Sequence, residues 1–183
     1  MKTWLFIPLL FFLYACRLGS SSESGQTLAE RFCVSDDAFI ATDDAFSSGA
    51  LKTVFADKIE INLPFGALNQ LHQELGLPMQ LNAEMDHEVY MMDFLGMLNQ
   101  QSCFCTILVD VEFNGRQKEL VLMSVAGNTL TPVAILAGDY SFAECTIELS
   151  SAFIDKNIEV VKQRTCMGEE EEPVILNLSG KLK

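Results

Sequence analysis

The chain has 183 residues, of which 49% are hydrophobic and 20% are charged, which is the composition of an ordinary globular protein. Its 25 acidic residues outnumber 12 Lys and Arg, and the formal net charge of -13 argues against a nucleic acid as partner, because phosphate binding requires a basic surface. A chain of this length has room for one domain whose core does not depend on disulfides or metal ions.

A hydrophobic segment follows Lys2 near the amino terminus. Its residues, Trp4 to Ala15, carry no charge, but a membrane-spanning helix needs about 20 apolar residues, and Pro8 interrupts the middle of this segment. A positive residue, a short apolar run and then a polar stretch are typical of secretory signals. We therefore interpret residues 1–15 as a signal peptide.

The apolar run ends in the tetrapeptide Leu13-Tyr14-Ala15-Cys16. It resembles the lipobox of bacterial lipoproteins, in which a Leu three residues before a Cys and a small residue directly before it direct lipid attachment to the thiol and cleavage on its amino side. Tyr14 departs from the usual small or β-branched residue, and ordinary cleavage after Ala15 would leave the same start without lipid. The resemblance implies lipid attachment with palmitate at Cys16 and anchoring in the cell envelope. Because Arg17 stands where a retention-type Asp would, it implies the outer membrane if the source is a diderm bacterium.

Residues 16–27 are polar and have too little apolar surface to fold, which favours a flexible tether before a single domain at residues 28–183. The segment Ser35–Phe39 is echoed by Thr42–Phe46. The four Asp of this repeat fit helix caps and turns better than calcium ligands, since the spacing of an EF-hand is absent. The acidity of the domain predicts a monomer, because like charges oppose close association.

Two helices are predicted after a first strand. Lys58–Leu63 alternates polar and apolar residues, which indicates a half-buried strand. Ala67–Leu75 has apolar residues at helical spacing, and Gly76 and Pro78 are typical of a helix end. Glu84–Asn99 is interpreted as a second helix, although its centre also fits a strand.

The second predicted helix carries a stripe of methionines that includes Met85 and Met92, with His87 close by. Thioether side chains repack around varied partners, so Met85, Met92 and His87 form a weak candidate for a ligand surface. Packing in the core is the favoured interpretation of the stripe. His87 lies between two acids and could serve in acid–base chemistry, but a solvated imidazole is the simpler reading.

Strand patterns dominate from Cys103 onward, so the predicted fold class is α+β, mainly an antiparallel β meander of about six to seven strands with one or two helices inserted after the first strand. Predicted strands are Phe104–Phe113, Glu119–Val125, Val133–Leu136, Phe142–Ser150, Ile158–Cys166 and Val174–Ser179. Predicted turns are Gly138–Asp139, Ser150–Ser151, Asp155–Asn157 and Gly168–Pro173.

The register of the first of these hairpins is left between two alternatives. Asn114–Gly115 is a strong turn signal, because both residues tolerate positive φ. A strict two-residue loop would set Asp110 opposite Glu119, two like charges. A three-residue loop with a bulge would set Glu112 opposite Lys118, and this form is preferred.

Five cysteines follow Cys16, so at least one has no partner within the chain. Cys103 and Cys105 share one strand face roughly 6.6 Å apart, too awkward a geometry for joining each other. Cys145 and Cys166 lie almost equidistant from the predicted Asp155–Asn157 turn and are the favoured disulfide, with Cys103 or Cys105 as competing partners. Two reduced, buried thiols are the alternative.

Function is the least determined property. The sequence contains no G-x-S-x-G turn, Cys–His pair, phosphate loop or zinc knuckle, so no catalytic residue, metal or cofactor is predicted. The run Glu169–Glu172 reads most simply as a solvated loop. We expect a non-enzymatic envelope lipoprotein that binds another envelope protein or a small apolar ligand. The alternative is a hydrolase with spatially assembled carboxylates, which would need a deep pocket with two or more convergent acids.

Overall fold

The computed structural model describes residues 27–33, 58–99, 102–112, 116–154 and 157–177. The predicted signal peptide, Cys16, most of the predicted tether, the Asp-rich repeat and the Asn114–Gly115 turn lie outside these residues. Two helices are described, α1 (Leu28–Phe32) and α3 (Phe65–Leu75). The strands are β1 (Asp86–Asn99), β2 (Ser102–Glu112), β3 (Arg116–Ala126), β4 (Thr129–Phe142), β5 (Cys145–Ile154), β6 (Asn157–Cys166), β7 (Glu169–Glu170) and β8 (Val174–Asn177).

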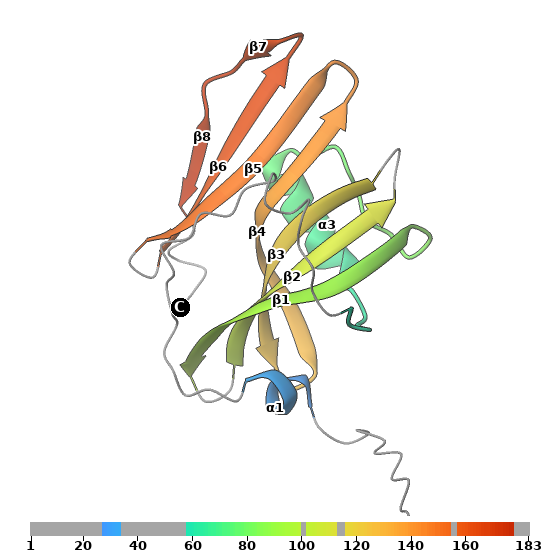
Figure 1. The fold of residues 1–183 in the computed structure, drawn as a ribbon, viewed down its shortest axis with the longest axis vertical. Coiled ribbons are helices and arrows are strands. Elements are labelled where there is room, and N and C mark those ends of the chain that lie inside the picture. The colour runs from blue at the N-terminus through green and yellow to red at the C-terminus, as the bar shows by residue number, and fades with distance from the viewer. Residues whose placement is uncertain (1–26, 34–57, 100–101, 113–115, 155–156, 178–183) are drawn as a thin grey trace, which may run out of the picture.

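The strands form one antiparallel sheet in which neighbours in sequence are neighbours in space. The order runs from β1 to β7, and β8 returns to pair with β6, so the predicted meander is present (Figure 1). The sheet has eight strands, whereas the described helices are few and short. The fold is therefore mainly β rather than α+β.

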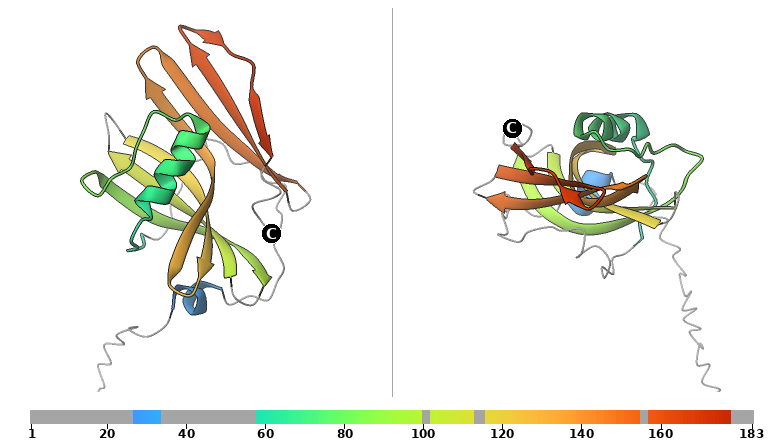
Figure 2. Two further views of the ribbon diagram at one scale, coloured as in Figure 1. Left: turned by 180° about the vertical axis from the view of Figure 1, so that it is seen from behind. Right: turned by 90° about the horizontal axis from the view of Figure 1, so that it is seen from above.

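Helix α3 lies across one face of the sheet (Figure 2). Its buried side chains are Leu68, Leu71 and His72, which recur at helical spacing and face the strands. Gly76 ends the helix in the left-handed region at φ 63°, and the Leu77 amide donates to the carbonyl oxygen of His72 across this end. Helix formation at Ala67–Leu75 was predicted, and the structure extends it to Phe65.

Helix α1 closes one end of the sheet (Figure 1). Thr27 and Glu30 form a reciprocal capping box at its start, and hydrogen bonds from Thr27 lower the pKa of the Glu30 carboxyl. A disulfide from Cys33 to Cys103 and a hydrogen bond from the Ala29 amide to the Gly127 carbonyl oxygen hold α1 against the strands. Among the described residues, no helix is long and apolar enough to cross a membrane.

Two predicted elements near the start of the domain are corrected. Lys58–Leu63 is not a strand, because its only ladder contact is an isolated bridge from Lys58 to Tyr90. Glu84–Asn99 is not a helix, because Asp86–Asn99 is strand β1. The register of β1 against β2 shifts at three places, between residues 91 and 99. Each shift changes which residues share a face, so the apolar spacing resembled a helical period.

The β2–β3 hairpin has a register that neither predicted alternative described. Glu112 lies opposite Arg116, so three residues separate the strands, as the preferred form required. Lys118, however, lies opposite Asp110 rather than Glu112. Its ammonium is 3.8 Å from the Asp110 carboxylate, and this pairing avoids the like-charge contact between Asp110 and Glu119.

Strand β4 is longer than predicted, β5 runs past Ser150, and the two-residue strand β7 lies inside the predicted Gly168–Pro173 turn. Gly138–Asp139 and Ser150–Ser151 are not turns, since they lie inside β4 and β5. The turn between these strands follows Phe142, which pairs with Cys145. The small and polar residues at these two positions are typical of turns between strands, but here the ladder pairing continues through them.

Burial divides the sheet into two kinds of strand. Every residue of the segment Cys103–Val111 in β2 is buried, so both faces of this strand are covered. In β5, Ile147 and Leu149 are buried, while Thr146 is exposed, so only one face is covered. This difference places the core around β2–β4 and leaves the β5–β8 side accessible.

Candidate functional site

An apolar cavity of about 330 Å³ lies between α3 and three strands of the sheet. Its volume is at the lower end of the range of small-molecule sites, which is roughly 300–1,000 Å³. Most of its lining is aliphatic, with a carboxylate and an amide among the lining side chains. The lining residues are Leu71, Glu74 and Leu75 of α3, Ala134 and Ile135 of β4, Val160 of β6, and Ile175, Leu176 and Asn177 of β8.

The cavity lies where the sheet divides. β4 pairs with β5 only from Gly138 opposite Leu149 to Phe142 opposite Cys145. Before Gly138, β4 pairs with β3 alone among the described strands. Along this part of the sheet, β4 and β5 diverge from each other (Figure 1). Ala134 of β4 and Val160 of β6 therefore face the cavity from opposite sides of this division.

Two polar contacts hold α3 and the segment after it in place. The Lys162 ammonium of β6 donates to the Leu75 carbonyl oxygen at 3.0 Å, which places a cation at the negative end of the helix. The Asn69 side chain donates to the Leu81 carbonyl oxygen and accepts from the Leu81 amide, both at 2.7 Å. The wall that α3 gives to the cavity is therefore fixed by hydrogen bonds as well as by apolar packing.

A buried polar cluster lies beneath α3. The Glu119 Oε2 atom of β3 is 2.8 Å from His72 Nε2 of α3 and accepts a hydrogen bond of 2.8 Å from the Tyr140 hydroxyl of β4. All three side chains are at most 1% exposed. Burial, together with the adjacent Glu119 carboxylate, raises the pKa of the Tyr140 hydroxyl well above its usual value.

Gly138 makes this cluster possible. It lies directly opposite Glu119 in the ladder, and the Tyr140 ring folds back over it. A Cβ atom at Gly138 would be 2.6 Å from the Tyr140 hydroxyl oxygen, closer than real Cβ contacts allow. The glycine is therefore required by the close approach of an aromatic ring, and it is not part of a turn.

The cluster is enclosed within the core. Its imidazole, carboxylate and phenol are convergent, but they are sealed from solvent and do not line either of the described cavities. Each of these cavities has one lining carboxylate, Glu74 in the first and Glu60 in the second. No group of three or more His, Cys, Asp and Glu suited to a metal ion occurs in the described part of the chain.

The second cavity is a more open and polar depression of about 340 Å³. It lies between residues 58–62 and β1, and His87 and Val89 line it from the strand. His87 Nδ1 is 3.0 Å from the Met85 carbonyl oxygen. Met92 lies five residues further along an extended strand, roughly 16 Å away, so Met85, His87 and Met92 do not form one compact surface.

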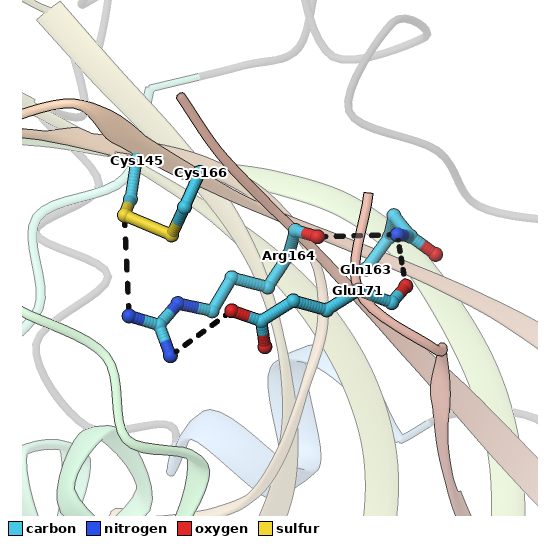
Figure 3. The surroundings of a disulfide bond; sticks show 5 residues. All are labelled: Cys145, Gln163, Arg164, Cys166 and Glu171. Atoms are coloured by element: carbon cyan, nitrogen blue, oxygen red, sulfur yellow. Dashed lines mark hydrogen bonds and ion pairs between the residues drawn. A yellow bond between two sulfur atoms is a disulfide. The ribbon is translucent and has the colours of Figure 1, made fainter. Parts of the chain in front are cut away.

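The cysteines are arranged as two disulfides and one thiol in the described residues. Cys145 pairs with Cys166, directly opposite it in the β5–β6 ladder (Figure 3), and Cys33 pairs with Cys103. Cys105 is reduced and buried, and burial raises the pKa of its thiol to about 12. Cys103 and Cys105 do not join each other, in keeping with their spacing along β2.

Sequence reasoning missed the cavity and the cluster for one reason. Both are assembled from segments far apart in the chain, such as His72 with Glu119 and Leu71 with Leu176. The available signals were a His on the apolar side of a helix and a Glu inside an apolar strand, which show that a partner is needed but not which one. No family model, curated protein or solved structure matches the chain.

Proposed function

We propose that this chain is an exported, lipid-anchored binding module whose cavity between α3 and β4, β6 and β8 takes a small apolar ligand. The observation that carries the proposal is the cavity itself, which has the size and the mainly aliphatic lining of a small-molecule site. Its walls come from elements held by the buried cluster and by Lys162, and such preorganised walls lower the free-energy cost of binding.

The lining supports an uncharged apolar ligand with at most one polar group. Leu71, Val160 and Leu176 offer apolar surface, while Glu74 and Asn177 are the polar residues of the lining. The Glu74 carboxylate and the acidity of the whole chain disfavour anionic compounds such as fatty acids. A compact apolar compound with a hydroxyl or an amine at the Glu74 end fits the lining best.

Binding of the neutral fluorophore N-phenyl-1-naphthylamine tests the proposal. We expect saturable fluorescence enhancement with the wild-type chain and at least about tenfold weaker binding after Leu75→Trp, which fills the cavity from the half-buried side of α3. Leu130→Trp is the matched control, because Leu130 is also half-buried but does not line the cavity. Equal binding by both variants, or no binding by the wild type, would contradict the proposal.

The anchor is tested separately. The lipobox-like Leu13-Tyr14-Ala15-Cys16 leads us to expect that the precursor takes up labelled palmitate in a diderm host and fractionates with membranes. Cys16→Ala is expected to abolish the label, because the thiol is the proposed attachment point. Labelling that persists in this variant, or an unlabelled wild type, would contradict lipid anchoring and would leave the cavity proposal intact.

A further inference from the structure

The large hydrophobic side chains that are exposed in the described residues all lie on one edge of the sheet. They are Met167 at 82% exposure, Val174 at 47% and Ile175 at 64%. Met167 is in the turn that follows β6, and the other two are in β8, which pairs only with β6 among the described strands. Exposed apolar side chains gathered in one place are typical of interaction sites.

The same edge carries the most concentrated negative charge in the sequence. Glu169 to Glu172 are all exposed and connect the Met167 turn to β8. The Arg164 guanidinium lies 3.5 Å from the Glu171 carboxylate, whereas the other three glutamates are exposed and form no ion pair with another described residue. We name the surface formed by Met167, Glu169–Glu172, Val174 and Ile175 the acidic edge.

The acidic edge is held in a fixed shape. The Gln163 side chain donates to the Glu171 carbonyl oxygen at 2.8 Å (Figure 3). The Glu171 amide donates to the Arg164 carbonyl oxygen at 2.8 Å. The Cys145–Cys166 disulfide ties β6 to β5 directly beside this segment. The Met167 backbone adopts φ 53°, a left-handed conformation that residues with side chains rarely adopt, and the Met167 side chain is exposed to solvent. The edge is thus a formed strand edge with regular hydrogen bonds on its inner side.

Natural sheets protect such edges with Lys, with Pro inside the strand, or with a covering element. Here Pro173 only precedes β8, and the residues in the strand itself are Val, Ile, Leu and Asn. Among the described strands β8 forms a ladder with β6 alone, and a strand edge of this kind with apolar side chains accepts an additional strand readily. Its four neighbouring glutamates select for a basic partner and repel both a second copy of this acidic chain and an anionic membrane.

We propose that the acidic edge is a docking site for an extended, basic segment of another protein, which adds as a strand along β8. Main-chain hydrogen bonds to β8 would supply part of the affinity, and the apolar side chains of alternate residues would contact Ile175 on one face of the strand, since Val174 points to the other face. Lys or Arg residues of the segment would lie beside Glu169, Glu170 and Glu172. The acidic edge shares Ile175 with the lining of the cavity, but Met167, Val174 and the four glutamates lie outside that lining, so either proposal can fail without the other.

A labelled peptide of about ten residues with alternating Lys and Val is the probe, and fluorescence anisotropy with the wild-type chain is the readout. Two versions carry N-methyl groups on alternate amides, one on the Lys residues and one on the Val residues. A strand added to an edge turns every second amide toward the protein. We expect one version to bind at least about tenfold more weakly and the other to bind as the parent does. Equal effects of the two versions, or no binding of the parent, would overturn the proposal.

Charge variants complete the test. Glu170→Gln with Glu172→Gln is expected to weaken binding about threefold to tenfold at low salt. The control pair, Glu60→Gln with Glu84→Gln, changes the net charge equally and is expected to alter binding by less than about twofold. Equal weakening by both pairs would show attraction to total charge alone and would overturn the docking site. If light scattering finds dimers that form through β8, the occupant of the acidic edge is a second copy of this chain. That result would also overturn the proposal of a basic partner.

Discussion

Strands β2–β4 and strands β5–β8 belong to one sheet but are buried in different ways. In β3, the consecutive residues Leu120 to Met123 are all 0% exposed, so side chains are covered on both faces. In β5 and β6, buried residues such as Ile147 and Val160 alternate with accessible ones. The first region has the burial of a protein interior, and the second has one solvated face.

The difference separates stability from binding. The region covered on both faces supplies most of the apolar burial and holds the His72–Glu119–Tyr140 cluster. The region covered on one face supplies the outer wall of the cavity and the acidic edge. Substitutions in the first region are therefore expected to change the free energy of unfolding, and those at the solvated positions of the second region to change binding with little effect on folding.

The largest effect on stability is expected at the buried cluster. His72→Leu removes one of the two partners of the Glu119 carboxylate in the cluster and leaves the Tyr140 hydroxyl, and we expect a loss of about 3–5 kcal/mol in the free energy of unfolding by urea. The double variant His72→Leu with Glu119→Leu should recover much of this loss, because no unpaired charge is left. A double variant as unstable as the sum of the two single variants would show that the pair is not coupled.

The contrast between two-sided and one-sided burial is tested with neighbouring residues. Leu122→Ala and Met123→Ala in β3 are each expected to cost about 2–5 kcal/mol, because both side chains are fully buried on opposite faces. In β5, Ile147→Ala should cost a similar amount, while Thr146→Ala should stay within about 0.5 kcal/mol. Thermal and urea unfolding measure all four. A small loss for either β3 variant, or a large one for Thr146→Ala, would remove the contrast.

A smaller loss is expected at Gly138. Gly138→Ala forces the new methyl group against the Tyr140 ring, and we expect a cost of about 1–3 kcal/mol. Gly66→Ala in α3 is the matched control, because its methyl group meets no atom within 4 Å and alanine favours a helix. The control should be neutral or more stable than the wild type. Equal responses of the two variants would mean that the Tyr140 ring does not require the glycine.

The smallest effect is expected at the acidic edge. Ile175→Ser removes an apolar side chain that is 64% exposed, so the free energy of unfolding should change by no more than about 0.5 kcal/mol. The same variant should weaken binding of the alternating Lys–Val peptide, since that peptide is proposed to contact Ile175. A loss of stability above about 1 kcal/mol would show that β8 belongs to the core rather than to a binding edge.

The local parts of this fold were predictable from the sequence. Antiparallel pairing of consecutive strands and the helix ending at Gly76 follow from short-range patterns, and the structure contains both. Strand β1 was mistaken for a helix because its register shifts distort the two-residue period. Gly138 was mistaken for a turn residue. The glycine is needed because the Tyr140 ring packs against it, and the sequence pattern does not reveal that contact.

The candidate site was not predictable in the same way. The cavity exists because β4 and β5 diverge after a short shared ladder, and the length of that ladder is a property of the whole sheet. Its lining residues, such as Leu71, Ala134 and Leu176, read individually as ordinary core positions. The acidic edge was partly visible as the run Glu169–Glu172, but its exposed apolar neighbours in an edge strand required the topology.

The central claim, an apolar ligand between α3 and the divided sheet, is tested most directly by a crystal structure of the chain with 2-bromonaphthalene. Anomalous scattering from bromine locates this uncharged compound without reference to the protein atoms. We expect one strong peak within contact distance of Leu71, Val160 and Leu176 and the loss of this peak in Leu75→Trp. A peak elsewhere on the molecule, or an empty cavity at saturating compound, would contradict it.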